Sequence, residues 1–105
     1  MNDIEVLQAV ETAAAEGRGV ALATVVRTRG SVPRKAGSKM VIDPDRGLVG
    51  TIGGGCGEGD VIAVAADVIR SGLPRTVRVE LMDATDTWSP AVCGGVMEIF
   101  VERVS

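Results

Sequence analysis

Histidine is absent from the 105-residue sequence, and this absence excludes several kinds of site. Without an imidazole, the chain cannot by itself form a Ser-His-Asp or Cys-His catalytic arrangement or a histidine-ligated metal centre. Cysteine is also scarce, because Cys56 and Cys93 are the two in the chain. One copy therefore cannot complete a four-cysteine zinc or iron–sulfur site.

Aromatic residues are nearly absent, with Trp88, Phe100 and no tyrosine. The chain thus offers no platform for stacking bases, and its net charge of -3 also argues against a nucleic-acid partner. With 46% apolar residues, the chain has enough aliphatic side chains for a core. Its length is that of one domain, so we expect residues 1–105 to form a single domain.

Long hydrophobic runs are missing too, since none approaches the roughly 20 residues that span a bilayer. The first residues carry acids, including Asp3 and Glu5, where a signal peptide carries basic residues. These features predict a soluble cytoplasmic protein that does not bind a membrane. In that reducing compartment, two cysteines indicate function or burial more than a structural disulfide.

Positive charge is concentrated in one part of the sequence. Between Gly17 and Ile42 the chain has no acid and six basic residues, which are Arg18, Arg27, Arg29, Arg34, Lys35 and Lys39. A basic segment on an acidic protein is a candidate seat for a small anion. The alternative interpretation is a solvated strand edge or loop.

Hydrophobic periodicity and turn residues predict an α+β fold with a mixed sheet of about five strands and two helices. The predicted helices cover residues 3–16 and 60–71, and the predicted strands cover residues 19–27, 40–43, 47–52, 76–81 and 96–104. The first helix has Val6, Leu7, Val10, Ala13 and Ala14 as its apolar face, and the second has Val61, Ile62, Ala65, Val68 and Ile69. The β-branched run 19–27 is expected to be a central strand.

A glycine-rich segment, GGGCGEGD at residues 53–60, lies between a predicted strand and the second predicted helix. Such a loop lets an anion approach the backbone and the free N–H groups of the helix start, and Gly53, Gly54 and Gly55 are the candidates here. A thiolate at Cys56 is favoured by the helix field, whereas the neighbouring acid Glu58 opposes an anion. A tight structural turn is the alternative.

Two further segments carry candidate chemistry. Cys93 is followed by Gly94 and Gly95 at the start of the last predicted strand, so the two cysteines are candidates to face each other across a cleft. A disulfide or a dithiol redox pair is the alternative. In the basic loop, the candidate groups for gripping a phosphate or carboxylate are Arg27, Arg29, Ser31, Arg34 and Lys35.

In combination, three segments resemble the N-terminal domain of the XdhC/CoxI family: TVVRTRGSVPRKAGSKM, GTIGGGCGEGD and VCGGVMEIFVE, in this order. The resemblance runs from about Val20 to Val104. The positions that match the family's motifs are Gly30, Ser31, Pro33, Arg34, Gly37, Gly53, Gly54, Gly55, Cys56, Glu58, Cys93, Gly94 and Gly95. Together these motifs are far more specific than any one glycine loop.

The resemblance implies an accessory protein rather than an enzyme. Members of the family are maturation factors that bind molybdenum cofactor, assist its sulfuration and insert it into molybdenum hydroxylases such as xanthine dehydrogenase or carbon monoxide dehydrogenase. It implies that the cofactor (molybdopterin) is bound transiently, with Cys56 and Cys93 as contacts of molybdenum or sulfur. An anionic, sulfur-ligated guest suits glycine loops, arginines and soft thiolates.

The resemblance also implies partners: an apo molybdenum hydroxylase and a sulfur donor. Longer members continue into a C-terminal Rossmann-like domain that this sequence does not contain, so a separate Rossmann-like protein is a further expected partner. We also expect a homodimer. The alternatives are a thiol redox protein that uses Cys56 and Cys93, and an assembly module without ligand chemistry.

Overall fold

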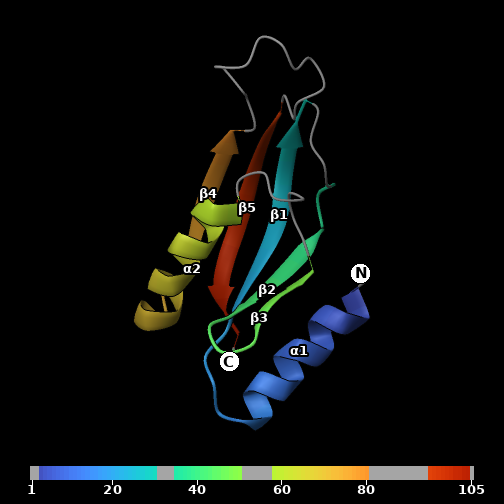
Figure 1. Ribbon diagram of the computed structural model, residues 1–105. Coiled ribbons are helices and arrows are strands. Elements are labelled where there is room, and N and C mark those ends of the chain that lie inside the picture. The colour runs from blue at the N-terminus through green and yellow to red at the C-terminus, as the bar shows by residue number, and fades with distance from the viewer. Residues whose placement is uncertain (1–2, 31–34, 51–57, 81–94, 105) are drawn as a thin grey trace.

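The computed structural model describes residues 3–30, 35–50, 58–80 and 95–104. Two helices and five strands follow one another in these ranges (Figure 1). Their bounds are α1 Asp3–Ala15, β1 Ala21–Arg29, β2 Lys39–Asp43, β3 Gly47–Gly50, α2 Glu58–Ser71, β4 Arg75–Glu80 and β5 Val96–Arg103. Both helices end before a glycine with positive φ, Gly17 after α1 and Gly72 after α2, a conformation typical of a helix C-terminus.

The five strands form one sheet in the order β3-β2-β1-β5-β4, and β1 lies at its centre as predicted. All four pairings between the described strands are antiparallel. The predicted α+β class with two helices and about five strands is confirmed, whereas the expected mixed sheet is antiparallel. Because β5 returns beside β1, the strand pairs are hairpins or antiparallel neighbours rather than βαβ crossovers.

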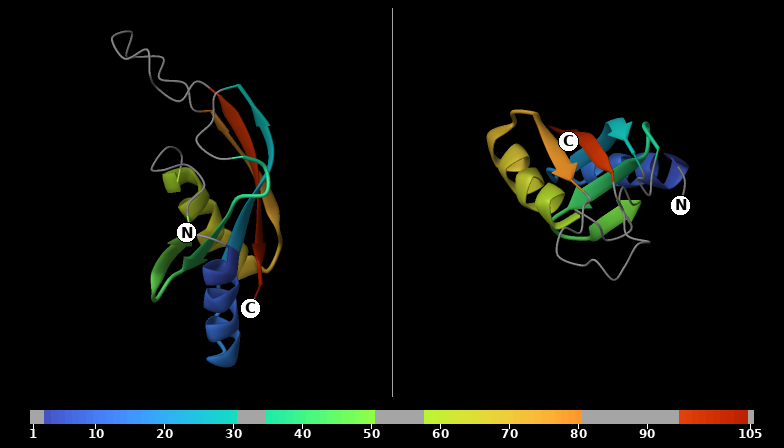
Figure 2. Two further views of the ribbon diagram at one scale, coloured as in Figure 1. Left: turned by 90° about the vertical axis from the view of Figure 1, so that its right-hand side faces the viewer. Right: turned by 90° about the horizontal axis from the view of Figure 1, so that it is seen from above.

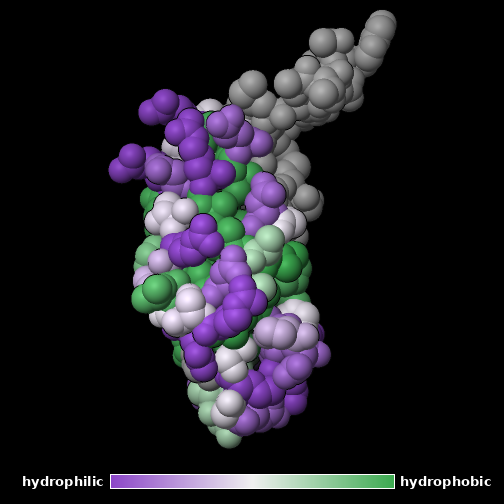
Figure 3. Space-filling model, turned by 90° about the vertical axis from the view of Figure 1, so that its left-hand side faces the viewer, coloured by the Kyte–Doolittle hydropathy of each residue, from purple (hydrophilic) through white to green (hydrophobic). Residues whose placement is uncertain are grey.

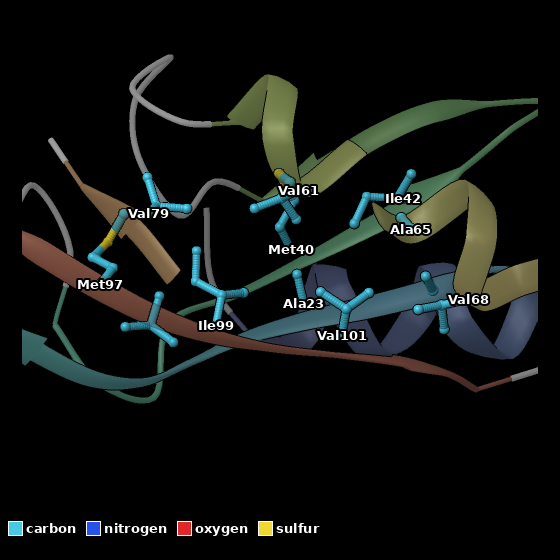
Figure 4. Packing of buried hydrophobic residues seen from close by; sticks show 12 residues of the cluster. Ala23, Met40, Ile42, Val61, Ala65, Val68, Val79, Met97, Ile99 and Val101 are labelled. Carbon is cyan, nitrogen blue, oxygen red and sulfur yellow. The ribbon is translucent and has the colours of Figure 1, made fainter. Parts of the chain in front are cut away.

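The two helices pack on opposite faces of the sheet. Side chains of α2, namely Val61, Ala65 and Val68, join one buried cluster with alternate residues of the strands (Figure 4). On the other face, Val6 and Ala13 of α1 pack in a second cluster on β2 and β3. The left-hand view of Figure 2 shows α2 along one side of the sheet and α1 beside the β2–β3 hairpin.

Burial on β5 alternates strictly, which fixes the two faces of the sheet. Met97, Ile99 and Val101 are fully buried on the α2 side, and the residues between them are half-buried. We call the face that carries Val96 and Glu98 the open face, because α2 covers the opposite one and α1 covers this one over β2 and β3 rather than over β4 and β5.

A register shift in β1 changes which side chains reach each face. Val25 pairs with Ile99, but the next pair along the strands is Arg27 with Glu98, so Val26 is an extra residue opposite β5. Such a bulge moves every later side chain of the strand to the other face. Arg27 and Arg29 therefore lie on the open face, whereas simple alternation after Val25 would have pointed them toward α2.

Three apolar residues predicted to face the core lie at the surface instead. Leu7 of α1 is 58% exposed, Ile62 of α2 is 39% exposed, and Ala14 of α1 is also exposed. Each follows a fully buried valine or alanine by one residue, a step of about 100° around a helix, which carries the side chain off the narrow buried stripe. The described helices include none that is long and apolar enough to cross a membrane.

Candidate functional site

The structure describes five of the residues predicted to form the site. These are Arg27 and Arg29 at the end of β1, the exposed Lys35 between β1 and β2, Glu58 as the first residue of α2, and the buried Gly95 just before β5. The other predicted site residues lie outside the described ranges: Ser31, Arg34, Gly53, Gly54, Gly55, Cys56, Cys93 and Gly94. The contacts of both cysteines with molybdenum or sulfur therefore stay predictions.

Neighbouring strand ends bring two of the three predicted segments to the same end of the sheet. Arg29, the last residue of β1, pairs with Val96, the first residue of β5. Val96 also pairs with Glu80, the last residue of β4. The basic segment that continues from Arg29 and the cysteine segment that leads into Val96 thus attach to adjacent strands at the upper end of the sheet in Figure 1.

The third predicted segment enters α2 on the covered face of the sheet. Figure 4 shows Val61, within the first turn of α2, near Val79 and Met40. These three residues belong to the core cluster on the α2 side. The chain that carries Cys56 therefore runs directly into a helix that begins on this side, and the free N–H groups of a helix start are donors for an anion.

The side chains of Arg27 and Arg29 lie on the other face. Their cross-strand partners, Glu98 and Val96, alternate with buried residues that contact α2. Within the described residues, the sheet thus separates these two guanidinium groups from the start of α2. We predicted that the arginines and the two cysteine segments line one cavity, and this stays a prediction.

On the open face, the arginines line a hollow of about 130 Å³. Its lining comes from the ends of three strands: Arg27, Thr28, Arg29, Arg78, Val96 and Glu98. Arg27 Nε lies 3.4 Å from Glu98 Oε2, and Arg78 Nε lies 3.7 Å from Glu80 Oε2. Figure 3, which views the molecule from the left-hand side of Figure 1, shows strongly hydrophilic side chains gathered at the upper left.

Arg78 is a member of this cluster that sequence reasoning missed. The alternation of β4 indicates that Arg78 points away from Val77 and Val79, but not which strand lies beside it. Arg78 is the register partner of Glu98 across β4 and β5, and Glu98 is the register partner of Arg27 across β5 and β1. This proximity depends on the strand order, which no local pattern in the sequence encodes.

A second charged cluster ties the chain before β1 to the β2–β3 hairpin. Arg18 Nη1 donates to both carboxylate oxygens of the buried Asp43, at 2.6 and 2.7 Å. Arg18 Nε donates to Glu16, and Arg46 Nη2 donates to the other oxygen of Glu16. The backbone N–H groups of Asp45 and Arg46 also donate to Asp43, which closes the hairpin turn.

These contacts perturb both members of the central pair. The side-chain hydrogen bond from Arg18 lowers the pKa of Asp43 below its ordinary value of 3.8, and this effect outweighs burial. Hydrogen bonds to Asp43 and Glu16 raise the pKa of Arg18 further above its ordinary range. A cavity of about 200 Å³ adjoins the pair, but its lining includes Ala9 and Val49 and its charged groups are already bonded to each other. We therefore assign this cluster to structure rather than to chemistry.

Metal-binding side chains do not gather in the described part of the chain. Within those ranges, no three Asp, Glu, Cys or His side chains are placed to hold an ion. The described site is thus cationic and made of guanidinium groups, which bind oxyanions and carboxylates rather than metals.

Known proteins are similar to this chain in both sequence and fold. It is 35% identical over 88 residues to a protein of Bacillus subtilis named as a probable xanthine dehydrogenase subunit, covering 80% of this chain. It is 33% identical over 90 residues to the molybdenum cofactor insertion chaperone PaoD of Escherichia coli, covering 84% of this chain. An uncharacterized protein of Escherichia coli, YqeB, is 33% identical over 81 residues, covering 77% of this chain.

The fold is similar to part of a crystal structure of a xanthine dehydrogenase from Bacillus halodurans. The TM-score is 0.79 and the identity 33%, and the match covers all of this chain but 31% of the other. The chain likewise spans only 26%, 27% and 15% of the lengths of the Bacillus subtilis protein, PaoD and YqeB. Residues 13–80 match the model of one protein family, and we conclude that the chain belongs to the XdhC and CoxI family.

Proposed function

We propose that this chain is an accessory module in the maturation of a molybdenum hydroxylase of the xanthine dehydrogenase or carbon monoxide dehydrogenase type. The observation that carries the proposal is its 33% identity over 90 residues to a protein named as a molybdenum cofactor insertion chaperone. Membership of the XdhC and CoxI family supports it. In this proposal the chain acts in the cytoplasm, binds the cofactor as cargo and catalyses no reaction of its own.

The residues we propose for cofactor contact are those of the three motif segments. Thiolates at Cys56 and Cys93 are soft groups suited to a sulfur-ligated metal. Gly53, Gly54 and Gly55 let an anion approach the backbone closely. The position of Cys56 supports this assignment, because α2 begins two residues later at Glu58 and the field of a helix start favours a thiolate.

The arginines of the basic segment have different roles in this proposal, because two of them lie on the face opposite α2. Ser31 and Arg34 belong to the family's motif and stay candidate contacts of the cofactor's anionic groups. Arg27 and Arg29 lie on the open face, away from α2, so we place them at the margin of the cofactor site. The proposed partners are an apo molybdenum hydroxylase, a sulfur donor and a separate Rossmann-like protein.

Cofactor binding is tested by anaerobic incubation of the purified chain with molybdenum cofactor, followed by gel filtration and measurement of molybdenum in the protein fraction. We expect co-elution in a fixed ratio with the wild type. The single variants Cys56→Ala and Cys93→Ala should each reduce it. Gln8→Ala, on an exposed position of α1, serves as the control that should retain the cofactor.

Two results would contradict the proposal. If the wild type retained no cofactor at micromolar concentration, the chain would not be a cofactor-binding module. If retention survived loss of both cysteines, the thiols would not be the contacts. Alkylation after a defined redox poise separates the thiol redox alternative, because that alternative alone requires the two cysteines to be oxidised and reduced as a pair.

A further inference from the structure

The upper part of the open face is uncovered by the described helices. There α2 packs on the opposite side of the sheet, and α1 packs on β2 and β3 rather than on β4 or β5. Three arginines from two strands point outward from this region: Arg27 and Arg29 from β1 and Arg78 from β4. On a chain with net charge -3, the lining of this hollow holds three arginines against the single acid Glu98.

These three arginines are exposed and form few and long ion pairs with the other residues that the structure describes. The side chains of Arg27 and Arg78 are 77% and 64% exposed, and their ion pairs are 3.4 and 3.7 Å long. Arg29 has no hydrogen-bond or ion-pair partner among the residues that the structure describes. Each guanidinium group carries five N–H donors, so most donors of the cluster have no acceptor among the residues that the structure describes.

Glu98 shows how a carboxylate lies among the arginines of this face. It is paired in register with Arg27 on one side and with Arg78 on the other. Of these two arginines, Arg27 forms the ion pair with Glu98, which shows that a carboxylate fits beside a guanidinium group on this face. One pair further along the sheet, Arg29 lies opposite Val96, which offers no charge. Glu80 lies on the other side of Val96, on β4, and is paired with Arg78, so Arg29 is the arginine left for a carboxylate from outside.

We propose that Arg27, Arg29 and Arg78 form a docking surface for an acidic segment of a partner protein. The hollow is open and its arginines are exposed, so each new ion pair changes the Kd by no more than about fivefold. A single small anion gains little there, whereas a segment with several carboxylates adds such contacts together.

This surface goes beyond the proposed cofactor-binding role and does not depend on it. The arginines lie on the face opposite α2, so the docking of a partner here requires neither Cys56 nor Cys93. The docking proposal depends on guanidinium groups, whereas the cofactor-binding proposal depends on thiols. An experiment can therefore contradict either one without contradicting the other.

The test uses the full chain, labelled with ¹⁵N, and a peptide of eight consecutive glutamates as the probe. We expect the amides of residues 27–29, 78 and 96–98 to shift on titration. Arg29→Gln should raise the Kd about twofold to fivefold, and the combined change of Arg27, Arg29 and Arg78 to Gln at least about tenfold. Raising ionic strength from about 50 to about 200 mM should weaken binding, because exposed charges are screened.

Arg70→Gln is the matched control, since Arg70 is a 75% exposed arginine on α2. It should change the Kd less than about twofold. The proposal is overturned if the shifted amides lie elsewhere, or if Arg70→Gln weakens binding as much as Arg29→Gln. Inorganic phosphate provides a further arm: if it shifts the same amides with a Kd no higher than that of the peptide, the surface is a small-anion site instead.

Discussion

Arg18 holds the buried carboxylate of Asp43 with both oxygens within 2.7 Å of one guanidinium nitrogen. The two residues are 25 positions apart, one just before β1 and the other at the end of β2. Their contact joins the segment after α1 to the turn of the β2–β3 hairpin. The hairpin in turn ends at Gly50, the last described residue before the glycine-rich segment.

Replacement of Asp43 by Asn should destabilise the fold. The amide cannot satisfy Arg18 and the two backbone N–H groups of the turn as the carboxylate does, and unmet buried donors cost about 1–3 kcal/mol. The free energy of unfolding from urea titration should fall by that amount. Asp45→Asn, at a 70% exposed side chain, should change it by less than about 0.5 kcal/mol. Equal effects of the two variants would contradict the assigned role.

The same carboxylate predicts a loss of stability in acid. The pKa of Asp43 is lower in the folded chain than its ordinary value of 3.8, so between the two values the unfolded chain binds more protons. The contribution is fully present above 3.8 and is lost as the pH falls through the folded-state pKa. Unfolding measured across this range should show a shallower acid dependence in Asp43→Asn than in the wild type, and an identical dependence would exclude the mechanism.

Gly50 should not tolerate a side chain. Its φ is 87°, and a Cβ there would lie 2.6 Å from the carbonyl oxygen of Lys39. Gly50→Ala should therefore cost at least about 1–3 kcal/mol of stability, read from thermal or urea unfolding. Gly59→Ala is the matched control, because it lies in α2 with nothing within 4 Å of the added atom. It should leave stability unchanged or raise it by up to about 1 kcal/mol.

The two faces of β5 should respond differently to truncation. Met97 is fully buried against the α2 side, so Met97→Ala should cost about 2–5 kcal/mol through lost burial and the cavity it leaves. Val96→Ala, one residue earlier on the open face, should cost less than about 1 kcal/mol. Comparable losses at both positions would mean that the open face is covered in solution.

Much of the fold follows from local sequence patterns. The sequence alternation divides the last strand into two sides, and the side with Met97, Ile99 and Val101 is the buried one. The segment DPDRG, residues 43–47, is typical of a hairpin turn, and the structure has the β2–β3 hairpin there. Both features are local, so neighbouring residues carry the information. Family membership was predicted from three motif segments in combination and is confirmed by the match to residues 13–80.

The remaining features depend on non-local pairing. Nothing in the run ALATVVRTR marks Val26 as the extra residue, because the bulge is defined against β5. The nearness of Arg78 to Arg27 likewise requires the strand order β1-β5-β4. The glycine and cysteine positions of the candidate site lie outside the described residues, so their grouping still depends on the family's motifs.

The bulge at Val26 has a consequence for how related chains should be compared. Because each residue in a strand reverses the direction of the next side chain, an insertion or deletion of one residue between Val25 and Arg27 would transfer positive charge from one side of the sheet to the other. A change of length here would thus move Arg27 and Arg29 to the α2 side of the sheet although neither arginine had been replaced. An alignment that ignores a one-residue gap at this point would equate arginines that have opposite orientations.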